Sequence, residues 1–264
     1  MKIATVSLNQ IWKDKNSNLK NSTKYIKLAS KNKVDLIIFP EMTLTGFSTD
    51  VNVISETFKD SFTILSFQTL AKKYNIAVIF GVVLTHKHKT FNKAIFINKK
   101  GSILNRYIKI HPFSLTKEEK FFKAGERLEI VKFKNLKIGL TICYDLRFPE
   151  LYTAYSDKNS DIIINIANWP KKRVKHWNSL LKARAIENQM FIIGVNRVGV
   201  DGNNLEYKES SNIYNANGEK LNYLLYKEMK IFKINQKWTK EFKKRFNTTH
   251  DRKLELYRSF YAKK

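Results

Sequence analysis

The chain has 264 residues, 43% of them hydrophobic, which is enough to bury a substantial core and excludes a disordered protein. The apolar positions before Gln10 are too few for a secretory signal, and no apolar run approaches the roughly 18 residues that cross a bilayer, so we expect a cytoplasmic protein without a membrane partner. The net charge is +26, but the lysines are scattered and few of the 49 basic residues are the arginines on which nucleic-acid readers depend, so no nucleic-acid partner is favoured.

Apolar, β-branched runs recur along most of the chain. Most of them are continuous rather than alternating, which predicts strands that are buried on both faces. We expect these strands over residues 3–8, 35–41, 76–84, 93–98, 136–145, 161–169 and 190–199.

Helical patterns lie between several of these runs. Apolar positions three and four residues apart predict helices over 16–33, 55–74 and 172–188. Beyond residue 200 the sequence predicts hairpin-like strands around 215–220, and then a polar helical tail in which Trp238, Phe242 and Phe246 recur like a buried stripe. The alternation of strands and helices predicts an α/β layered fold. The chain has no linker or composition break, so we expect one domain over residues 1–264, with the tail from about residue 237 packing on the domain or on a dimer partner.

Three reactive or charged groups stand at the ends of apolar runs. Glu41 follows "LIIFP", Lys109 lies in "YIKIHPF", and Cys143, the only cysteine, lies in "TICYD". Each has an ordinary structural explanation: a solvated carboxylate, an outward lysine and a small buried hydrophobe. Their combination favours chemistry, because a thiol becomes a strong nucleophile only when a base or a positive neighbour promotes its thiolate form. A single cysteine also excludes an intramolecular disulfide and is typical of a reducing compartment.

These three motifs, in this chain order, resemble the nitrilase (carbon–nitrogen hydrolase) superfamily and its Glu-Lys-Cys triad. The resemblance extends through residues 167–204, where the sequence is most similar to the bacterial omega-amidase, or 2-oxoglutaramate amidase, type. It implies a four-layer αββα sandwich in a single domain, often paired into homodimers or higher homo-oligomers. It also implies an enzyme that needs no cofactor, and the five histidines form no convincing metal site in the sequence.

The resemblance assigns a role to each triad residue. Glu41 would be the general base, Cys143 the nucleophile that forms a thioester, and Lys109 a donor to the oxyanion together with the backbone N–H of Tyr144. A second glutamate of the family, seven residues before a glycine, corresponds to Glu118, and it would position Lys109. The adjacent Glu119 is one step away from this match.

Two further residues are candidates for substrate binding. Arg147 would either pair with a carboxylate such as Glu150 or bind the distal carboxylate of the substrate, for which an arginine fork is well suited. Trp169 would line the pocket or pack in the core. Arg184 and Glu187, three residues apart on a predicted helix, would join that helix to the segment after Cys143.

One position departs from the family pattern. Glu209 in "YKESS" stands where the resembling relatives tend to have glycine, so we expect an altered turn near the pocket or the dimer face.

The expected reaction is hydrolysis of the ω-amide of a small 2-oxo dicarboxylate monoamide, either 2-oxoglutaramate or 2-oxosuccinamate, to the acid and ammonia. The substrate would be a small, anionic amide. An alternative keeps the triad but changes the substrate to deaminated glutathione or an N-carbamoyl amine. An alternative of another class is a basic protein that binds nucleic acid or an anionic surface on the same fold.

Overall fold

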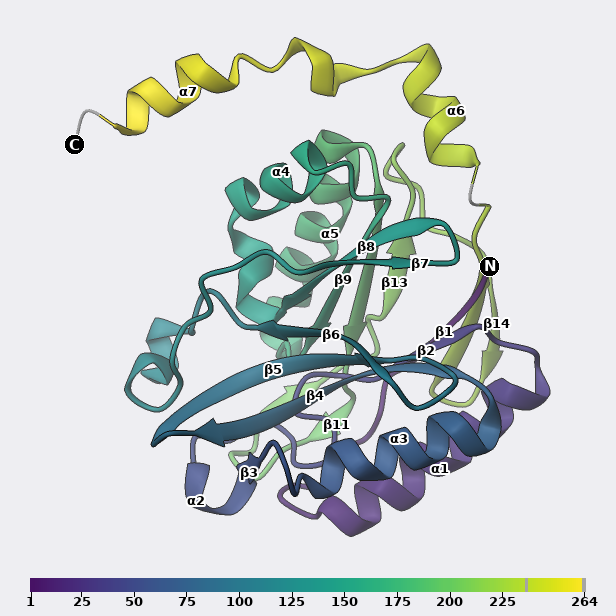
Figure 1. The fold of residues 1–264 in the computed structure, drawn as a ribbon, viewed down its shortest axis with the longest axis vertical. Helices are drawn as coiled ribbons and strands as arrows, with labels where there is room; N and C mark the ends of the chain where they lie inside the picture. Colours follow the sequence, from purple (N-terminus) through teal and green to yellow (C-terminus); the bar gives the residue numbers. More distant parts are fainter. Residues whose placement is uncertain (236, 263–264) are drawn as a thin grey trace.

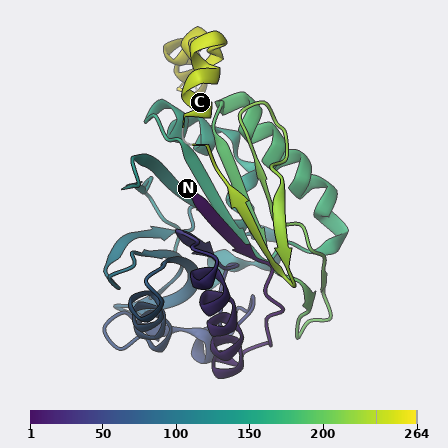
Figure 2. The same ribbon diagram turned by 90° about the vertical axis from the view of Figure 1, so that its right-hand side faces the viewer.

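The computed structural model describes residues 1–235 and 237–262, and it confirms the predicted four-layer αββα sandwich (Figure 1). Two sheets face each other. Helices α1 (Lys15–Lys31) and α3 (Phe62–Tyr74) cover the outer face of one sheet, and α4 (Pro149–Asp157) and α5 (Val174–Asn188) cover the outer face of the other. Figure 2 shows these two helical layers on opposite sides of the sheets.

The larger sheet has the strand order β14-β15-β1-β2-β4-β5-β6, with β3 paired to β4. The pairs among β1, β2, β3 and β4 are parallel, and the other pairs are antiparallel. The strands are β1 (Lys2–Val6), β2 (Leu36–Ile38), β3 (Glu56–Thr57), β4 (Ala77–His86), β5 (Lys89–Ile97), β6 (Ile103–Ile108), β14 (Tyr223–Tyr226) and β15 (Met229–Lys233).

The smaller sheet has the strand order β13-β10-β9-β8-β7, in which β8, β9 and β10 are parallel. Its strands are β7 (Ile130–Phe133), β8 (Leu136–Ile142), β9 (Ile162–Ala167), β10 (Phe191–Asn196) and β13 (Asn212–Tyr214). The remaining elements are β11 (Gly199–Val200), β12 (Glu206–Tyr207), α2 (Val51–Ile54), α6 (Trp238–Arg245), α7 (Leu254–Tyr261) and the 3₁₀ turns η1 (Ser114–Thr116), η2 (Glu118–Lys120), η3 (Cys143–Arg147), η4 (Lys171–Arg173) and η5 (Thr248–Asp251).

The layered core explains why the strand sequences are continuously apolar. Leu36 and Ile38 of β2 point into the core between the two sheets, whereas Ile37 points into the core under α1 and α3. Successive side chains of a strand point to opposite faces, and here both faces are covered. An uninterrupted apolar run is therefore the sequence pattern that this architecture requires.

Several expected boundaries differ from the structure for identifiable reasons. The helix expected from residue 55 begins only at Phe62, because the Ser61 hydroxyl caps the N–H of Ile64 at 3.1 Å. The sequence pattern did not predict α4, whose nine residues start with Pro149 at the first helical position. The segment at 215–220 is a turn that leads from the smaller sheet to the larger, with a single bridge between Tyr214 and Lys220.

The C-terminal tail contacts the domain through α6 and Arg252. Trp238 of α6 packs against Phe191, with ring centroids 6.1 Å apart, and Arg252 donates to the carbonyl oxygen of Glu187 at 2.8 Å. Phe246 is 61% exposed, so the expected apolar stripe is only partly buried. Helix α7 buries none of its residues and runs away from the domain (Figure 1). The assignment of residues 1–264 to one domain and the packing of the tail on a partner stay predictions.

No helix in the described part of the chain combines the length and the apolar character that a bilayer span demands.

The fold brings the ends of several strands to one edge of the sandwich. Strands β2, β6 and β8 end just before Pro40–Glu41, Lys109 and Cys143, respectively, and β9 ends just before Asn168. Strand β6 runs antiparallel to β5, which runs antiparallel to β4, so β6 has the direction of β2 and β4. In such sheets, side chains that meet ligands lie beyond the carboxyl ends of the strands.

Gly81 of β4 leaves room for the backbone that follows β2. A Cβ atom at this position would lie 2.3 Å from the backbone nitrogen of Met42 and 2.8 Å from the Cα of Glu41. We expect Gly81→Ala to lower the free energy of unfolding by about 1–3 kcal/mol, because the added methyl group collides with backbone. Urea unfolding of both proteins measures this. Without the collision, Gly→Ala in a strand would raise the stability by about 0.5–1 kcal/mol, so a gain would contradict the account.

Candidate active site

The structure brings Glu41, Lys109 and Cys143 together beyond the strand ends. The Nζ atom of Lys109 lies 3.3 Å from Oε1 of Glu41. Glu41 is fully buried, Lys109 is 2% exposed, and Cys143 is half-buried at the start of η3. Positions 41, 109 and 143 span 102 residues of the chain, yet the three side chains share one site.

The carboxylate of Glu41 is held by three donors. Oε1 accepts from the Asn92 side chain at 2.7 Å and from Lys109 at 3.3 Å, and Oε2 accepts from the backbone N–H of Asn168 at 2.9 Å. A carboxylate offers about four lone-pair sites, so about one site is left to take up a proton. The carbonyl of Asn168 also accepts from Sγ of Cys143 at 3.9 Å. Asn168 therefore contacts both the carboxylate and the thiol.

Lys109 is shared by two carboxylates. Its ammonium lies 2.9 and 2.8 Å from the two oxygens of Glu118, in addition to its contact with Glu41. Glu118 is buried and also accepts from the N–H of Phe113 at 2.8 Å, whereas Glu119 is exposed. Burial alone would lower the pKa of Lys109, but the charges of Glu41 and Glu118 outweigh burial and raise it, so the ammonium is protonated. The pKa of Glu118 is raised by its burial and by the charge of Glu41, against the lowering effect of Lys109.

Cys143 occupies a strained turn between β8 and η3. Its φ angle of +46° lies in the left-handed region, which costs a residue other than glycine about 1–3 kcal/mol. Asp145 stabilises the turn: its Oδ2 accepts from the N–H of Ile142 at 2.9 Å and from the Tyr107 hydroxyl at 2.7 Å. The guanidinium of Arg184 donates to the carbonyl of Leu146 at 3.1 Å, which confirms that α5 is joined to the turn.

The surroundings of Cys143 disfavour a free thiolate. Burial raises the pKa of the thiol most, the negative charge of Glu41 raises it further, and Lys109 only partly opposes them. The net effect is a thiol pKa well above its ordinary value. For the sulfur to act as a nucleophile, a nearby base would have to take its proton as it reacts.

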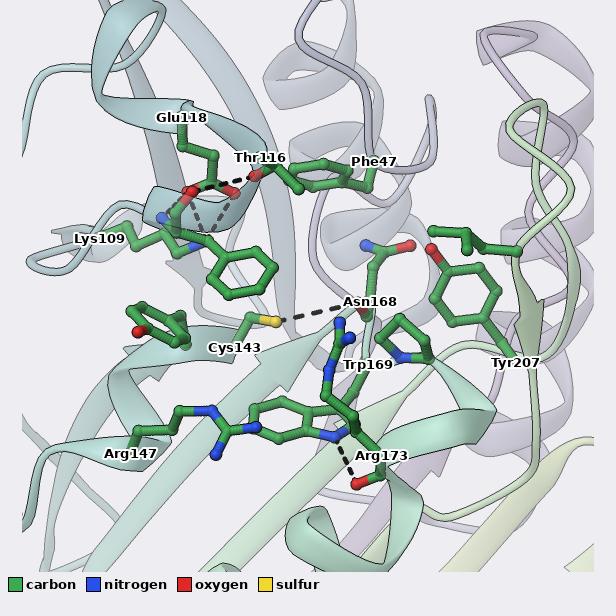
Figure 3. A pocket seen from close by; sticks show the side chains of 14 residues that line it. Phe47, Lys109, Thr116, Glu118, Cys143, Arg147, Asn168, Trp169, Arg173 and Tyr207 are labelled. Carbon is green, nitrogen blue, oxygen red and sulfur yellow. Dashed lines mark hydrogen bonds and ion pairs between the residues drawn. The ribbon is translucent and has the colours of Figure 1, made fainter.

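A cavity of about 60 Å³ opens onto the thiol. Every predicted site residue except Glu41 lines it, and Glu41 lies buried behind it. Figure 3 places Lys109 and Glu118 on one side of Cys143 and Arg147, Trp169 and Arg173 on the other, with Phe47 and Tyr207 at a further wall. The lining residues are Phe47, Lys109, Phe113, Thr116, Glu118, Cys143, Tyr144, Arg147, Asn168, Trp169, Pro170, Arg173, Leu205 and Tyr207.

Arg147 and Trp169 contact each other in the pocket wall. The guanidinium carbon of Arg147 lies 4.9 Å from the ring centroid of Trp169, and Nη2 lies 3.4 Å from Nδ1 of His176. Among the residues that the structure describes, no carboxylate forms an ion pair with Arg147, so Glu150 is not its partner. Trp169 is 3% exposed and also packs against Trp177, so it contributes both to the pocket and to the core.

Sequence reasoning missed several residues of the site, and four of them matter for its charge and geometry. Asn92 and Asn168 hold Glu41, Asp145 stabilises the turn at Cys143, and Arg173 lines the pocket. Asn168 and Asp145 lie at or next to the ends of the predicted strands 161–169 and 136–145, which is a signal that the strand-end argument could have used. Asn92 lies within β5 and Arg173 in a short lysine-rich turn, and neither position carries such a signal.

Glu209, which departs from the expected glycine, is accommodated by an ion pair. Its φ angle is not positive, so no left-handed turn is needed there. Its carboxylate lies 2.7 Å from the ammonium of Lys230 and accepts from the N–H of Ser211 at 2.9 Å. The segment after Tyr207 is thereby fastened to β15.

The sequence and the family models point to one family. The carbon–nitrogen hydrolase model matches residues 2–231. A protein named as a hydrolase in the agr operon of Staphylococcus aureus is 35% identical, over 83% of this chain and 85% of that protein. The omega-amidase YafV of Escherichia coli is 32% identical over 83% of each chain. A 2-oxoglutaramate amidase of Bacillus subtilis is 32% identical over 71% of this chain and 72% of that protein.

Solved structures agree with this similarity. A carbon–nitrogen hydrolase superfamily protein from Xanthomonas campestris, with an arsenic adduct in its active site, is 30% identical and covers 96% of this chain and 97% of its own, with a TM-score of 0.89. An amidase from Nesterenkonia sp. is 20% identical and covers 98% of this chain and 96% of its own, with a TM-score of 0.87, which supports the fold alone.

The neutral thiol can be tested by titration. Because burial and Glu41 raise the pKa of Cys143, the thiolate should be absent around the ordinary pKa of about 8.5 and appear only at higher pH. The measurement is the ultraviolet absorbance of the thiolate, taken as the difference between the wild type and Cys143→Ser. Glu41→Gln removes a negative charge and should lower the midpoint. A thiolate that forms below the ordinary pKa would show instead that Lys109 dominates the electrostatics of the thiol.

Proposed function

Because the chain belongs to the carbon–nitrogen hydrolase family and acts on amides, we propose that it hydrolyses the ω-amide of a small 2-oxo dicarboxylate monoamide. The substrates would be 2-oxoglutaramate or 2-oxosuccinamate. The observation that carries the proposal is a small cavity lined by Lys109 and Cys143 and by a pair of arginines, with buried Glu41 in contact with Lys109. The names of the Escherichia coli and Bacillus subtilis relatives support this substrate class.

The first half of the proposed reaction makes a thioester. Glu41 takes the proton of the Cys143 thiol while the sulfur attacks the amide carbon, so the C–S bond forms as the carbonyl electrons move to oxygen. The tetrahedral species then collapses and its C–N bond breaks. Protonated Glu41 gives its proton to the departing nitrogen, so that ammonia leaves and the acyl group stays on sulfur.

Lys109 and the N–H of Tyr144 would stabilise the oxyanion. Tyr144 lies in the first turn of η3, where backbone N–H groups lack partners within the turn. An ammonium has three donors, and in the free enzyme those of Lys109 face Glu41 and both oxygens of Glu118. One contact with Glu118 must therefore loosen as the oxyanion forms. Glu118 is then a positioning residue that holds Lys109 until the substrate charge develops.

The second half releases the acid. Glu41 takes a proton from a water molecule that adds to the thioester carbon, and collapse of this second tetrahedral species breaks the C–S bond. The leaving sulfur recovers its proton from Glu41. One amide and one water thus give one acid and one ammonia, and both Glu41 and Cys143 return to their starting states.

The substrate end that is not hydrolysed would lie against Arg147 and Trp169. Arg147 has no carboxylate partner among the described residues, and a guanidinium suits a carboxylate in geometry and charge. The small cavity favours a short acyl group over the peptide-sized group of deaminated glutathione. The homodimer and the cytoplasmic location stay predictions from the sequence.

A substrate panel tests the proposed function. Purified wild type and Cys143→Ser would be compared for ammonia release from 2-oxoglutaramate, 2-oxosuccinamate, glutamine, deaminated glutathione, an N-carbamoyl amine, a neutral aliphatic amide and a nitrile. We expect the two ω-amides of 2-oxo acids to be turned over fastest, with loss of activity in Cys143→Ser.

Other outcomes of the panel contradict specific parts of the proposal. Faster turnover of deaminated glutathione or an N-carbamoyl amine would support the proposed thiol chemistry but contradict the proposed substrate. No turnover of any compound, together with salt-sensitive binding to DNA that Cys143→Ser leaves intact, would favour the binding-protein alternative.

A further inference from the structure

Positive charge in the pocket is concentrated on the side away from Lys109. The charged lining residues are Lys109, Glu118, Arg147 and Arg173. The donors of Lys109 are directed at Glu41 and Glu118, so this cluster has a net charge of about −1 when the thiol is neutral. The two arginines therefore give the pocket a positive end opposite a negative one (Figure 3).

Arg173 differs from Arg147 in how its guanidinium is held. The backbone of Arg173 is fixed, because its carbonyl accepts from the indole nitrogen of Trp169 at 2.8 Å. Its guanidinium carbon lies 5.5 Å from the ring centroid of Phe113, within the range of a cation–π contact. Within the described residues, the guanidinium of Arg173 forms no ion pair, whereas that of Arg147 contacts His176.

Both arginines contact Trp169. Arg147 packs on the ring of Trp169, and Arg173 accepts from the nitrogen of the same ring through its carbonyl. A 2-oxo acid presents a carboxylate and an adjacent carbonyl oxygen, so it offers acceptors to more than one guanidinium fork. A simple carboxylate lacks this additional carbonyl acceptor.

We propose that Arg173 is a specificity-determining residue, which binds the 2-oxo acid end of the substrate together with Arg147 while the amide end reaches Cys143. This proposal rests on the proposed function for the identity of the substrate. It adds a second cation and a reason for selecting 2-oxo acids.

The anion site is connected to Lys109 through one segment. Phe113, whose ring supports the guanidinium of Arg173, donates its backbone N–H to Glu118 at 2.8 Å, and Glu118 in turn holds Lys109. An anion bound at Arg173 would thus fix the ring of Phe113 and the segment that carries Glu118. Discrimination at Arg173 should therefore appear in kcat as well as in KM.

An alkylation experiment tests the anion site without relying on turnover. Cys143 is the only cysteine, so alkylation reports on this pocket alone. We would measure the rates at which 4-bromocrotonate, an anion, and its neutral methyl ester alkylate each protein. The result for each protein is the alkylation ratio, the rate with the anion divided by the rate with the ester. In Arg173→Gln this ratio should fall by about tenfold to a hundredfold, as expected for the loss of a charge-assisted hydrogen bond.

Two further variants separate a bound anion from general charge. Lys172→Gln removes the same unit charge from the neighbouring residue of η4, which is exposed and does not line the pocket, so its ratio should match the wild type. Arg173→Lys keeps the positive charge but lacks the two parallel donors of a guanidinium, so its alkylation ratio should lie between those of Arg173→Gln and the wild type. Equal rates for the two reagents in the wild type, or equal falls in Arg173→Gln and Lys172→Gln, would overturn the proposal.

Turnover distinguishes this proposal from the proposed function. The neutral control is 4-oxopentanamide, which has a methyl group in place of the carboxylate of 2-oxoglutaramate. We expect Arg173→Gln to lower kcat/KM for 2-oxoglutaramate relative to kcat/KM for 4-oxopentanamide, by a factor similar to the fall in the alkylation ratio. If Arg173→Gln lowers the activity on both amides equally, the substitution disturbs the structure of the pocket and not the binding of the carboxylate, and the proposal is overturned. A wild type that hydrolyses neither amide would contradict the proposed function, while the alkylation ratio would still decide whether Arg173 binds anions.

Discussion

The site depends on one buried ammonium that two carboxylates share. Lys109 is 2% exposed and lies within 3.3 Å of Glu41 and 2.9 Å of Glu118, so each charge in the cluster is stable only while the others are present. Breaking a buried ion pair from one side typically costs about 3–5 kcal/mol, because it leaves a charge uncompensated in a dry interior. The cluster is therefore a structural centre, and in the proposed function it is also the source of the site's chemistry. Strands β2 and β6 and the segment with η2 must converge to form it.

This arrangement determines how the thiol can react. Burial and the negative charges of Glu41 and Glu118 raise the pKa of the Cys143 thiol, and Lys109 only partly opposes them, so the neutral thiol is favoured. In the proposed reaction, proton transfer to Glu41 accompanies the attack, and the same proton then goes to the leaving nitrogen. The arginines at the other side give the pocket a polarity, which would orient a substrate with an amide at one end and a carboxylate at the other.

The apolar runs predict an α/β layered fold, and the resemblance to the nitrilase superfamily implies the four-layer sandwich and the three principal side chains. A strand covered on both faces must be apolar throughout, as β2 and β9 are, and a strand end that carries a lone charge or thiol is conspicuous. The supporting residues give no such signal. Asn92 acts from the middle of β5 by a contact with a residue 51 positions away, and Arg173 is one of three basic residues in a turn. The prediction that a helix begins at residue 55 was wrong, because the pattern of apolar residues does not reveal the cap at Ser61. Contacts between residues that are far apart in the sequence can be identified only once the fold is known.

Trapping of the acyl-enzyme tests the central claim most directly, which is that Cys143 forms a thioester under the control of Glu41 and Lys109. Hydroxylamine added during turnover competes with water for a thioester and converts the acyl group to a hydroxamate. The account predicts that the wild type forms hydroxamate in proportion to the hydroxylamine present, and that Cys143→Ala forms neither hydroxamate nor ammonia. Continued ammonia release by Cys143→Ala, or turnover of the wild type without any hydroxamate, would contradict it.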